Sequence, residues 1–226
     1  MKRSEINAII RHAIDFCGKM NFALPPFVYW PPEDWAAKGP ECAEIVDNQL
    51  GWDITDFGSG DFYSVGLMLI TLRNGNASNA KYKKTYAEKI MIVRENQVTP
   101  MHYHFQKYED IINRGGGNLA IRLYNRTEDD ELADTPVSVS VDGVTRTVNA
   151  GGILVLKPGE SICMHAGLYH SFWGEDGTGT VLVGEVSRVN DDHNDNRFYE
   201  PTGRFPEIEE DEYPIHLLST EYPELG

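Results

Sequence analysis

The sequence predicts a mainly β domain, a sandwich or a barrel, with a helical extension at its N-terminus. From about residue 61, short stretches rich in β-branched and apolar residues follow one another and are bounded by Gly, Asn or Asp. Closely spaced strands with Gly and Pro between them are typical of all-β sandwiches and barrels. A chain of 226 residues that is 41% hydrophobic can bury one sizeable core, so we expect a single domain over residues 1–226.

Residues 1–58 are expected to form helices and a proline-rich segment that wraps the domain. Apolar residues recur at helical spacing at the start of the chain, where Ser4 can cap a helix and Gly18 can end it. Two Pro-Pro pairs within residues 21–35 argue against regular structure, because proline lacks an amide hydrogen and restricts the residue before it. A second short helix is expected over residues 42–49.

Residues 59–190 are expected to form the barrel, and residues 191–226 a surface tail. The clearest strand pair is residues 136–148, where two alternating runs are joined by Asp142-Gly143, a favoured two-residue hairpin turn. The other strand candidates are residues 62–72, 87–96, 118–125, 151–164, 169–175 and 180–189. The tail is acidic, irregular and interrupted by prolines, so we expect it to lie on the surface.

The composition limits the partners and the compartment. A formal net charge of -15 repels phosphate backbones and anionic lipid, so we expect no nucleic acid and no membrane as partner. Three scattered cysteines without a C-x-x-C pair indicate buried thiols in a reducing compartment. The start of the chain lacks the features of a signal peptide, and no run approaches the roughly 18 apolar residues that cross a membrane. The expected location is the cytoplasm.

The stretch from residue 101 to 117 carries the residues with the clearest chemistry. His102 and His104 are two apart, so both imidazoles point to the same face of a strand and can hold one metal ion. Glu109 has the wrong parity for that strand, and a turn or bulge would bring it to the same face. His170, far downstream in an aromatic-rich strand, is the fourth candidate ligand.

Each candidate ligand also has an ordinary structural interpretation. His102 and His104 can be a pair of surface histidines, because a chance H-x-H is not rare in a chain with seven histidines. Most glutamates are solvated, and Glu109 taken alone is no exception. His165 competes with His170, because their odd spacing puts only one of them on the metal-facing side of a regular strand. We favour His170.

The spacing of these residues resembles the two-part motif of the cupin family. H-x-H-x4-E is followed by a glycine-rich turn, and then by G-x5-P-G and a later histidine. The matching positions are His102, His104, Glu109, Gly116, Gly152, Pro158, Gly159 and His170. The resemblance implies a cupin β-barrel of the jelly-roll type that binds a divalent metal through the three histidines and Glu109. The gap before His170 is longer than in the general motif.

A narrower resemblance runs nearly from end to end of the chain. Residues 1–10, 21–35, 99–117 and 158–175 closely resemble the bacterial D-lyxose isomerases. This implies a homodimer with manganese as the usual metal, and interconversion of D-lyxose with D-xylulose, often also of D-mannose with D-fructose. Three imidazoles and one carboxylate also suit Fe, Co, Ni or Zn, and they leave two positions of an octahedral ion for sugar oxygens.

Isomerisation needs a base that moves a proton between C1 and C2, and two charged residues are candidates for catalysis. Glu185 shares a strand face with two valines, and burial there would raise the pKa of its carboxyl group. The alternative is a glutamate at the rim. Lys89 shares a face with Met91 and Val93 and can bind a sugar oxygen inside the barrel, as the family resemblance also implies. An exposed edge lysine is the alternative.

Asp192 and Trp173 are the remaining candidates for sugar binding. Aspartate accepts hydrogen bonds from hydroxyls, but Asp192 lies in an acidic stretch that is also typical of a solvated loop. Trp173 or its neighbour Phe172 can offer an apolar face to the sugar, and core packing is the alternative for at least one of them.

The leading hypothesis is therefore a metal-dependent aldose–ketose isomerase that acts on free sugars. An acidic chain without an evident basic phosphate-binding motif suits an uncharged substrate better than a sugar phosphate. Two other functions use the same site: an iron-dependent cupin oxygenase, and a metal-stabilised sugar-binding protein without turnover. A purely structural metal would leave no open coordination position.

Overall fold

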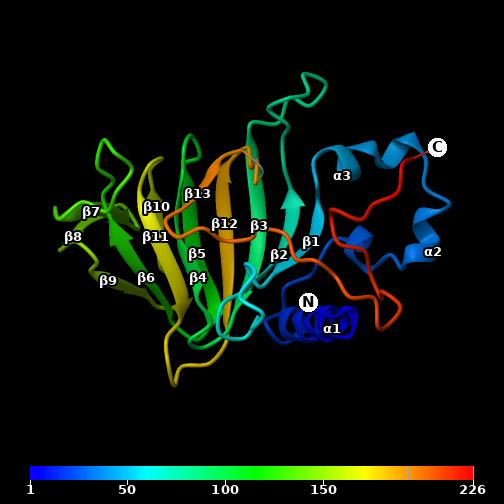
Figure 1. The fold of residues 1–226 in the computed structure, drawn as a ribbon, viewed down its shortest axis with the longest axis horizontal. Coiled ribbons are helices and arrows are strands. Elements are labelled where there is room, and N and C mark those ends of the chain that lie inside the picture. Colours follow the sequence, from blue (N-terminus) through cyan, green and yellow to red (C-terminus); the bar gives the residue numbers. More distant parts are fainter. Residues whose placement is uncertain (193, 226) are drawn as a thin grey trace.

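Two antiparallel β-sheets form the body of the molecule (Figure 1). The computed structural model describes residues 1–192 and 194–225. The larger sheet has the strand order β1-β2-β3-β12-β5-β10-β7-β8, and the smaller has the order β13-β4-β11-β6-β9. The mainly β architecture is as predicted, but the two sheets are not closed into one continuous barrel.

The strands are short, at three to eight residues. In the larger sheet they are β1 (Gly51–Thr55), β2 (Leu67–Arg73), β3 (Tyr86–Val93), β5 (Glu109–Gly116), β7 (Val137–Val141), β8 (Val144–Val148), β10 (Ser161–Met164) and β12 (Val181–Arg188). In the smaller sheet they are β4 (Thr99–His104), β6 (Leu119–Tyr124), β9 (Ile153–Leu156), β11 (Tyr169–Gly174) and β13 (Asn196–Phe198). The predicted β7–β8 hairpin is confirmed, and both residues of its Asp142-Gly143 turn have positive φ.

Alternation along β2, β3 and β12 divides the apolar side chains between two cores. One set belongs to the core that includes residues of the smaller sheet: Leu67, Leu69, Met91, Val93, Val181 and Val183. The intervening set packs against the apolar side of α1 (Arg3–Lys19): Met68, Ile70, Ile90, Ile92 and Leu182. Because both faces of these strands are covered, polar side chains between the two sheets are exceptional, and they mark the site described below.

The N-terminal helix α1 is confirmed, but its ends differ from the prediction. Ser4 does not cap the helix. Its amide and its hydroxyl instead donate to the two carboxylate oxygens of Asp211, at 2.8 and 2.7 Å, so the C-terminal tail supplies an acceptor for the helix start. Gly18 lies within the helix, and Asn21, with a φ of 55°, takes the left-handed conformation that follows it.

Short helices follow α1, so the expectation that residues 21–35 lack regular structure is wrong in part. Proline fits the first turn of a helix, where its missing amide hydrogen would have no partner. The helices that begin with proline are η1 (Pro26–Tyr29), α2 (Pro32–Trp35) and η2 (Pro40–Cys42). The helix predicted over residues 42–49 is found as α3 (Ala43–Asp47).

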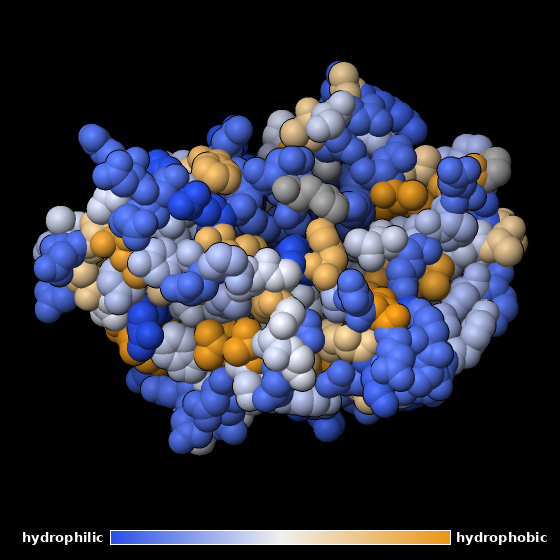
Figure 2. Space-filling model, viewed as in Figure 1, coloured by the Kyte–Doolittle hydropathy of each residue, from blue (hydrophilic) through white to orange (hydrophobic). Residues whose placement is uncertain are grey.

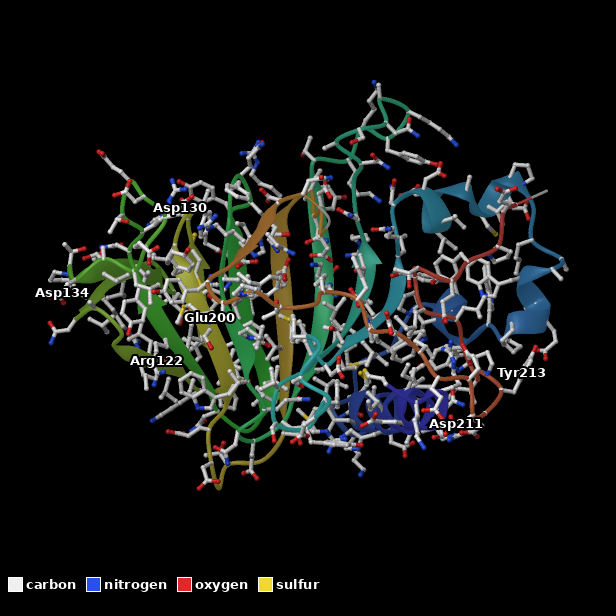
Figure 3. All side chains as sticks on the ribbon, viewed as in Figure 1. Arg122, Asp130, Asp134, Glu200, Asp211 and Tyr213 are labelled. Atoms are coloured by element: carbon white, nitrogen blue, oxygen red, sulfur yellow. The ribbon has the colours of Figure 1, made fainter. Side chains whose placement is uncertain are left out.

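The C-terminal tail contributes to both the smaller sheet and the helical layer. β13 pairs antiparallel with β4, so the tail supplies an edge strand as well as a surface cover. Farther along, the buried guanidinium of Arg3 pairs with Glu210 and Glu221, and Asp211 lies beside α1 (Figure 3). β1 likewise belongs to the larger sheet, although it lies in the segment predicted to be helical.

The molecular surface is mainly hydrophilic on the face shown in Figure 2, with small apolar patches. This agrees with the acidic composition and its net charge of -15. Within residues 1–192 and 194–225, no helix is both long enough and apolar enough to cross a membrane.

Candidate active site

Three histidines converge between the two sheets. His102 and His104 lie on β4, and His170 lies opposite His102 on the neighbouring strand β11. All three are buried, at 7%, 6% and 2% exposure, and their ligand atoms lie within 4.8 Å of one another. The competing residue His165 is exposed, and its ring centroid lies 6.5 Å from that of Tyr108. The structure therefore brings His170, and not His165, to the cluster.

Backbone carbonyls orient all three imidazoles in the same way. The Nδ1 atoms of His102, His104 and His170 lie 2.8, 3.3 and 3.0 Å from the carbonyl oxygens of Pro100, Asp195 and Leu168. An imidazole nitrogen that faces a carbonyl oxygen carries the hydrogen, and this leaves the Nε2 lone pair free. Burial, together with the two neighbouring histidines, holds the pKa of His102 well below its usual value, which keeps this ring neutral.

Glu109 brings a carboxylate to the same point. It is the first residue of β5, after the turn that the sequence predicts, and it is 4% exposed. Its Oε1 atom lies 3.4 Å from Nε2 of His104 and 3.1 Å from Nε2 of His170, and it has no hydrogen-bond partner. Lone pairs that face one another in a buried site need a cation, so this donor set fits a divalent metal.

Lys107 is a residue of the site that the sequence analysis missed. It is 3% exposed, and its Nζ lies 2.8 Å from Oε2 of Glu109 and 2.9 Å from Oε1 of Glu185. Burial favours the neutral amine, but the two glutamates and Asp192 hold the pKa of Lys107 well above its usual value. The sequence carried no signal for this position, because Lys107 lies in the turn before β5, where the alternation of strand faces does not apply.

Glu185 lies inside the molecule on β12 and is not at the rim. It is 4% exposed, and a second lysine, Lys89, lies 3.8 Å from the same carboxylate oxygen that Lys107 contacts. The expectation of a raised pKa is wrong. Burial does act in that direction, but Lys107 and Lys89 outweigh it and hold the pKa of Glu185 below its usual value. The two lysines therefore favour the ionised form of this carboxylate.

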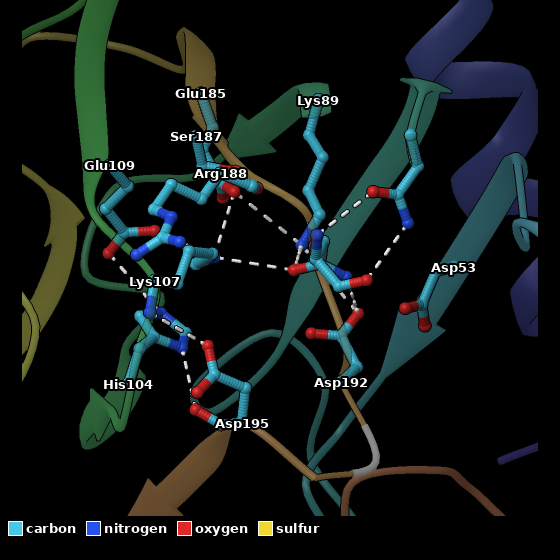
Figure 4. A network of polar contacts seen from close by, with 12 residues as sticks. Asp53, Lys89, His104, Lys107, Glu109, Glu185, Ser187, Arg188, Asp192 and Asp195 are labelled. Atoms are coloured by element: carbon cyan, nitrogen blue, oxygen red, sulfur yellow. Dashed lines mark hydrogen bonds and ion pairs between the residues drawn. The ribbon is translucent and has the colours of Figure 1, made fainter. Parts of the chain in front are cut away.

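Lys89 and Asp192 continue the polar network away from the histidines (Figure 4). Lys89 is 3% exposed on β3, and its Nζ lies 2.5 Å from Oδ1 of Asn190 and 3.7 Å from Oδ2 of Asp192. Asp192 in turn accepts hydrogen bonds from Asn190 at 2.9 Å and from Arg204 at 3.1 Å. Neither residue fits its surface alternative, and both line the same cavity as Glu185.

Trp173 is the predicted site residue that the structure does not bring to the cavity. His170 and Phe172 share the inner face of β11 and line the cavity, and the next residue points to the opposite face. The guanidinium of Arg122 lies 5.3 Å from the Trp173 ring on that outer side.

Asp195 fixes the turn between β4 and β5. Its carboxylate accepts hydrogen bonds from the amides of Gln106 and Lys107, at 2.8 and 3.0 Å. Its carbonyl oxygen accepts from the amide of Phe105 and faces Nδ1 of His104. One residue thus holds both a candidate metal ligand and the lysine beside the metal site (Figure 4).

We expect Asp195→Asn to weaken the binding of a divalent metal, with Mn²⁺ as the probe, about 10-fold, because a weakened turn no longer holds the carbonyl that orients His104 in place. The amide group would place an N–H donor against one of the two backbone N–H groups. Calorimetric titration of the metal-free protein with Mn²⁺ measures the effect. Asp176→Asn is the matched control, because that carboxylate also accepts a hydrogen bond, from Asn96, but at an exposed turn. An unchanged affinity would contradict the role given to Asp195.

Comparison with known proteins shows to which family the chain belongs. The family model described as D-lyxose isomerase matches residues 1–222. The chain belongs to the D-lyxose isomerase family. The D-lyxose/D-mannose isomerases of Serratia proteamaculans and Escherichia coli O157:H7 are 53% and 51% identical to it over 223 residues, with 98% of each chain covered. This confirms the resemblance on which the prediction relied, and the chain is a sugar isomerase of the aldose–ketose type.

Solved structures support the fold of this D-lyxose isomerase family member. The L-ribose isomerase of Cellulomonas parahominis, solved with L-ribose, has a TM-score of 0.60 at 16% identity and covers 92% of this chain and 98% of its own. The L-ribose isomerase of Geodermatophilus obscurus has a TM-score of 0.61 at 15% identity, with the same coverage. At such identities the likeness shows the fold alone, and it confirms the predicted cupin-type β fold.

Proposed function

We propose that this chain is a metal-dependent isomerase that interconverts D-lyxose with D-xylulose, and also D-mannose with D-fructose. The observation that carries the proposal is the buried convergence of three Nε2 atoms and the Glu109 carboxylate, directly beside the ionised carboxylate of Glu185. The names of the two bacterial relatives support the choice of sugars. The proposed metal is a divalent ion, Mn²⁺ first, and Fe, Co, Ni or Zn suit the same ligands.

His102, His104, Glu109 and His170 would hold this ion. When bound, the ion would polarise the sugar carbonyl and stabilise negative charge on the oxygens of C1 and C2. The neighbouring charged side chains would transfer the protons and bind the hydroxyl groups of the sugar. The apolar residues around them exclude water from the reaction, which strengthens every electrostatic interaction inside the cavity.

Glu185 is the proposed base. It would take the proton from C2 of the aldose and return it to C1, while the hydroxyl proton passes from O2 to O1. Lys107 bridges Glu185 and Glu109, so its ammonium group is placed to donate to the sugar oxygens during this exchange. Lys89 and Asp192 would bind hydroxyl groups farther along the sugar.

The assembly and location belong to the same proposal. The family resemblance supports a homodimer. All three cysteines are free, as suits a reducing compartment such as the cytoplasm, although Cys163 is exposed and not buried as predicted. Light scattering coupled to size-exclusion chromatography measures the mass of the assembly, and a monomer mass would contradict the first point.

Removal of metal is expected to abolish isomerisation, and a divalent ion should restore it. The protein is stripped with a chelator, and Mn, Fe, Co, Ni or Zn is restored separately. D-lyxose, D-mannose and their phosphates are offered to each form, and the ketose is quantified. Mn²⁺ should give the fastest conversion of the free sugars.

His104→Ala is the control for this experiment, because it removes one ligand and should lose activity in the presence of every metal. Metal binding without conversion of any sugar would contradict the proposed function. Oxygen uptake that depends strictly on iron would instead indicate the cupin oxygenase.

A further inference from the structure

A row of alternating charges extends from the metal site across the cavity wall. Starting at Glu109, each charged group contacts one of opposite sign, at 2.5 to 3.8 Å: Glu109, Lys107, Glu185, Lys89, Asp192, Arg204 and Asp53. Figure 4 shows the direction of the row: His104 and Glu109 lie at one end, Lys89 and Asp192 follow, and Asp53 lies at the far end. The end remote from the metal therefore has its own pair of charged groups.

Arg204 is the cation at this remote end. Its side chain is only 12% exposed and lines the cavity, although it comes from the C-terminal tail. Both terminal nitrogens donate to the Asp53 carboxylate on β1, and Nη2 also donates to Asp192. A guanidinium has five N–H donors, so these three bonds fix its position without using all of its donors.

Apolar side chains complete the lining of the cavity. Four of them lie on the larger sheet with Lys89 and Glu185, and the other three come from the smaller sheet and the segment after β1: Leu67, Leu69, Met91 and Ile111, then Phe172, Phe198 and Phe57. An open-chain sugar has hydroxyl groups along its chain and C–H groups between them. A cavity lined both by a row of charged hydrogen-bonding groups and by apolar side chains suits such a molecule laid along the row.

We propose, resting on the function proposed above, that Arg204 together with Asp192 binds the terminal hydroxyl of the sugar and sets the preference between hexose and pentose. With C1 and C2 beside Glu185 and the metal ligands, the rest of the sugar runs along the row toward Arg204. D-mannose is D-lyxose extended by one hydroxymethyl group at that remote end. The two substrates therefore differ where Arg204 lies, and Arg204 is a specificity-determining residue.

The first test uses the unaltered protein loaded with Mn²⁺. It compares D-mannose with 6-deoxy-D-mannose, which lacks only the terminal hydroxyl. A buried charged donor that loses its hydroxyl partner should lower kcat/KM at least tenfold, or about 1.4 kcal/mol. Equal kcat/KM values for the two sugars would overturn the inference. Because no residue is changed, misfolding cannot obscure this result, and a protein that converts no sugar would instead contradict the proposed function.

The second test changes the arginine. Arg204→Lys keeps a positive charge beside Asp53 but loses the fixed geometry of the guanidinium. We expect kcat/KM for D-mannose to fall at least tenfold more than kcat/KM for D-lyxose, and the discrimination against 6-deoxy-D-mannose to fall at least threefold. If Arg204 had only a structural role, kcat/KM would fall by the same factor for D-mannose, D-lyxose and 6-deoxy-D-mannose. That outcome would also overturn the inference.

Arg197→Lys is the matched control variant. Arg197 lies on the same tail, in β13, and pairs with Asp130 at 3.7 Å, but its side chain is 44% exposed. Its replacement should leave the ratios among the three sugars unchanged. A change in those ratios equal to that of Arg204→Lys would show that the tail as a whole, and not Arg204, sets the preference, which would overturn the assignment.

Discussion

Glu185→Gln is expected to lower kcat for D-lyxose about 10³-fold while the metal content stays the same. A positioned general base contributes about 10²- to 10⁴-fold to the rate, and a glutamine cannot accept the proton. The amide has nearly the shape of the carboxylate, and its oxygen can still accept the hydrogen bond from Lys107. The measurement is kcat with each variant loaded with Mn²⁺, with the bound metal quantified by mass spectrometry.

Exchange of the C2 hydrogen in D₂O gives a second readout for this variant, because it follows proton removal itself. Glu88→Gln is the matched control, since Glu88 lies next to Lys89 on β3 and pairs with Arg73 near the surface. It should retain activity within about twofold, as expected for a surface change. If Glu185→Gln keeps kcat within tenfold of the parent protein, another group is the base.

Three of the four candidate metal ligands could be placed together from the sequence because their spacing is local. Spacing of two puts His102 and His104 on one face of a strand, and one turn leads to the larger sheet, where Glu109 faces them. The same rule would have excluded Trp173, which is three residues after His170 and therefore faces the other side of β11. That error came from choosing an aromatic residue by type without applying parity.

The rest of the site depends on contacts between distant segments, which a single sequence does not show. Lys107 in isolation looks like a solvated turn residue, and only β12 brings Glu185 to it across 78 positions. Arg204 meets Asp53 across 151 positions. The sign of the pKa shift at Glu185 was wrong for the same reason. Burial could be predicted from the neighbouring valines, but the two lysines that outweigh it could not.

Lys107→Met is expected to lower the free energy of unfolding of the metal-free protein by about 3–5 kcal/mol, the usual cost of removing one partner of a buried ion pair. Lys107 is the cation between Glu109 and Glu185, and all three side chains are at most 6% exposed. Methionine has a similar length but leaves two buried carboxylates without their shared partner. Urea denaturation of the metal-free protein measures the change. Lys84→Met is the matched control, because Lys84 contacts Glu44 at 2.7 Å on the surface and should cost at most about 1 kcal/mol.

Adding Mn²⁺ to the Lys107→Met protein distinguishes the contribution of Glu109 from that of Glu185. A bound cation stabilises the folded state and neutralises Glu109, but Glu185 is not one of the proposed ligands. The metal should therefore recover part of the lost stability, and kcat should stay at least about 10²-fold below the parent value because the group that donates to the sugar oxygens is missing. Full recovery of kcat with Mn²⁺ would show that Lys107 serves only to balance charge. Loss of activity that persists after stability has been recovered would place its ammonium group in the reaction.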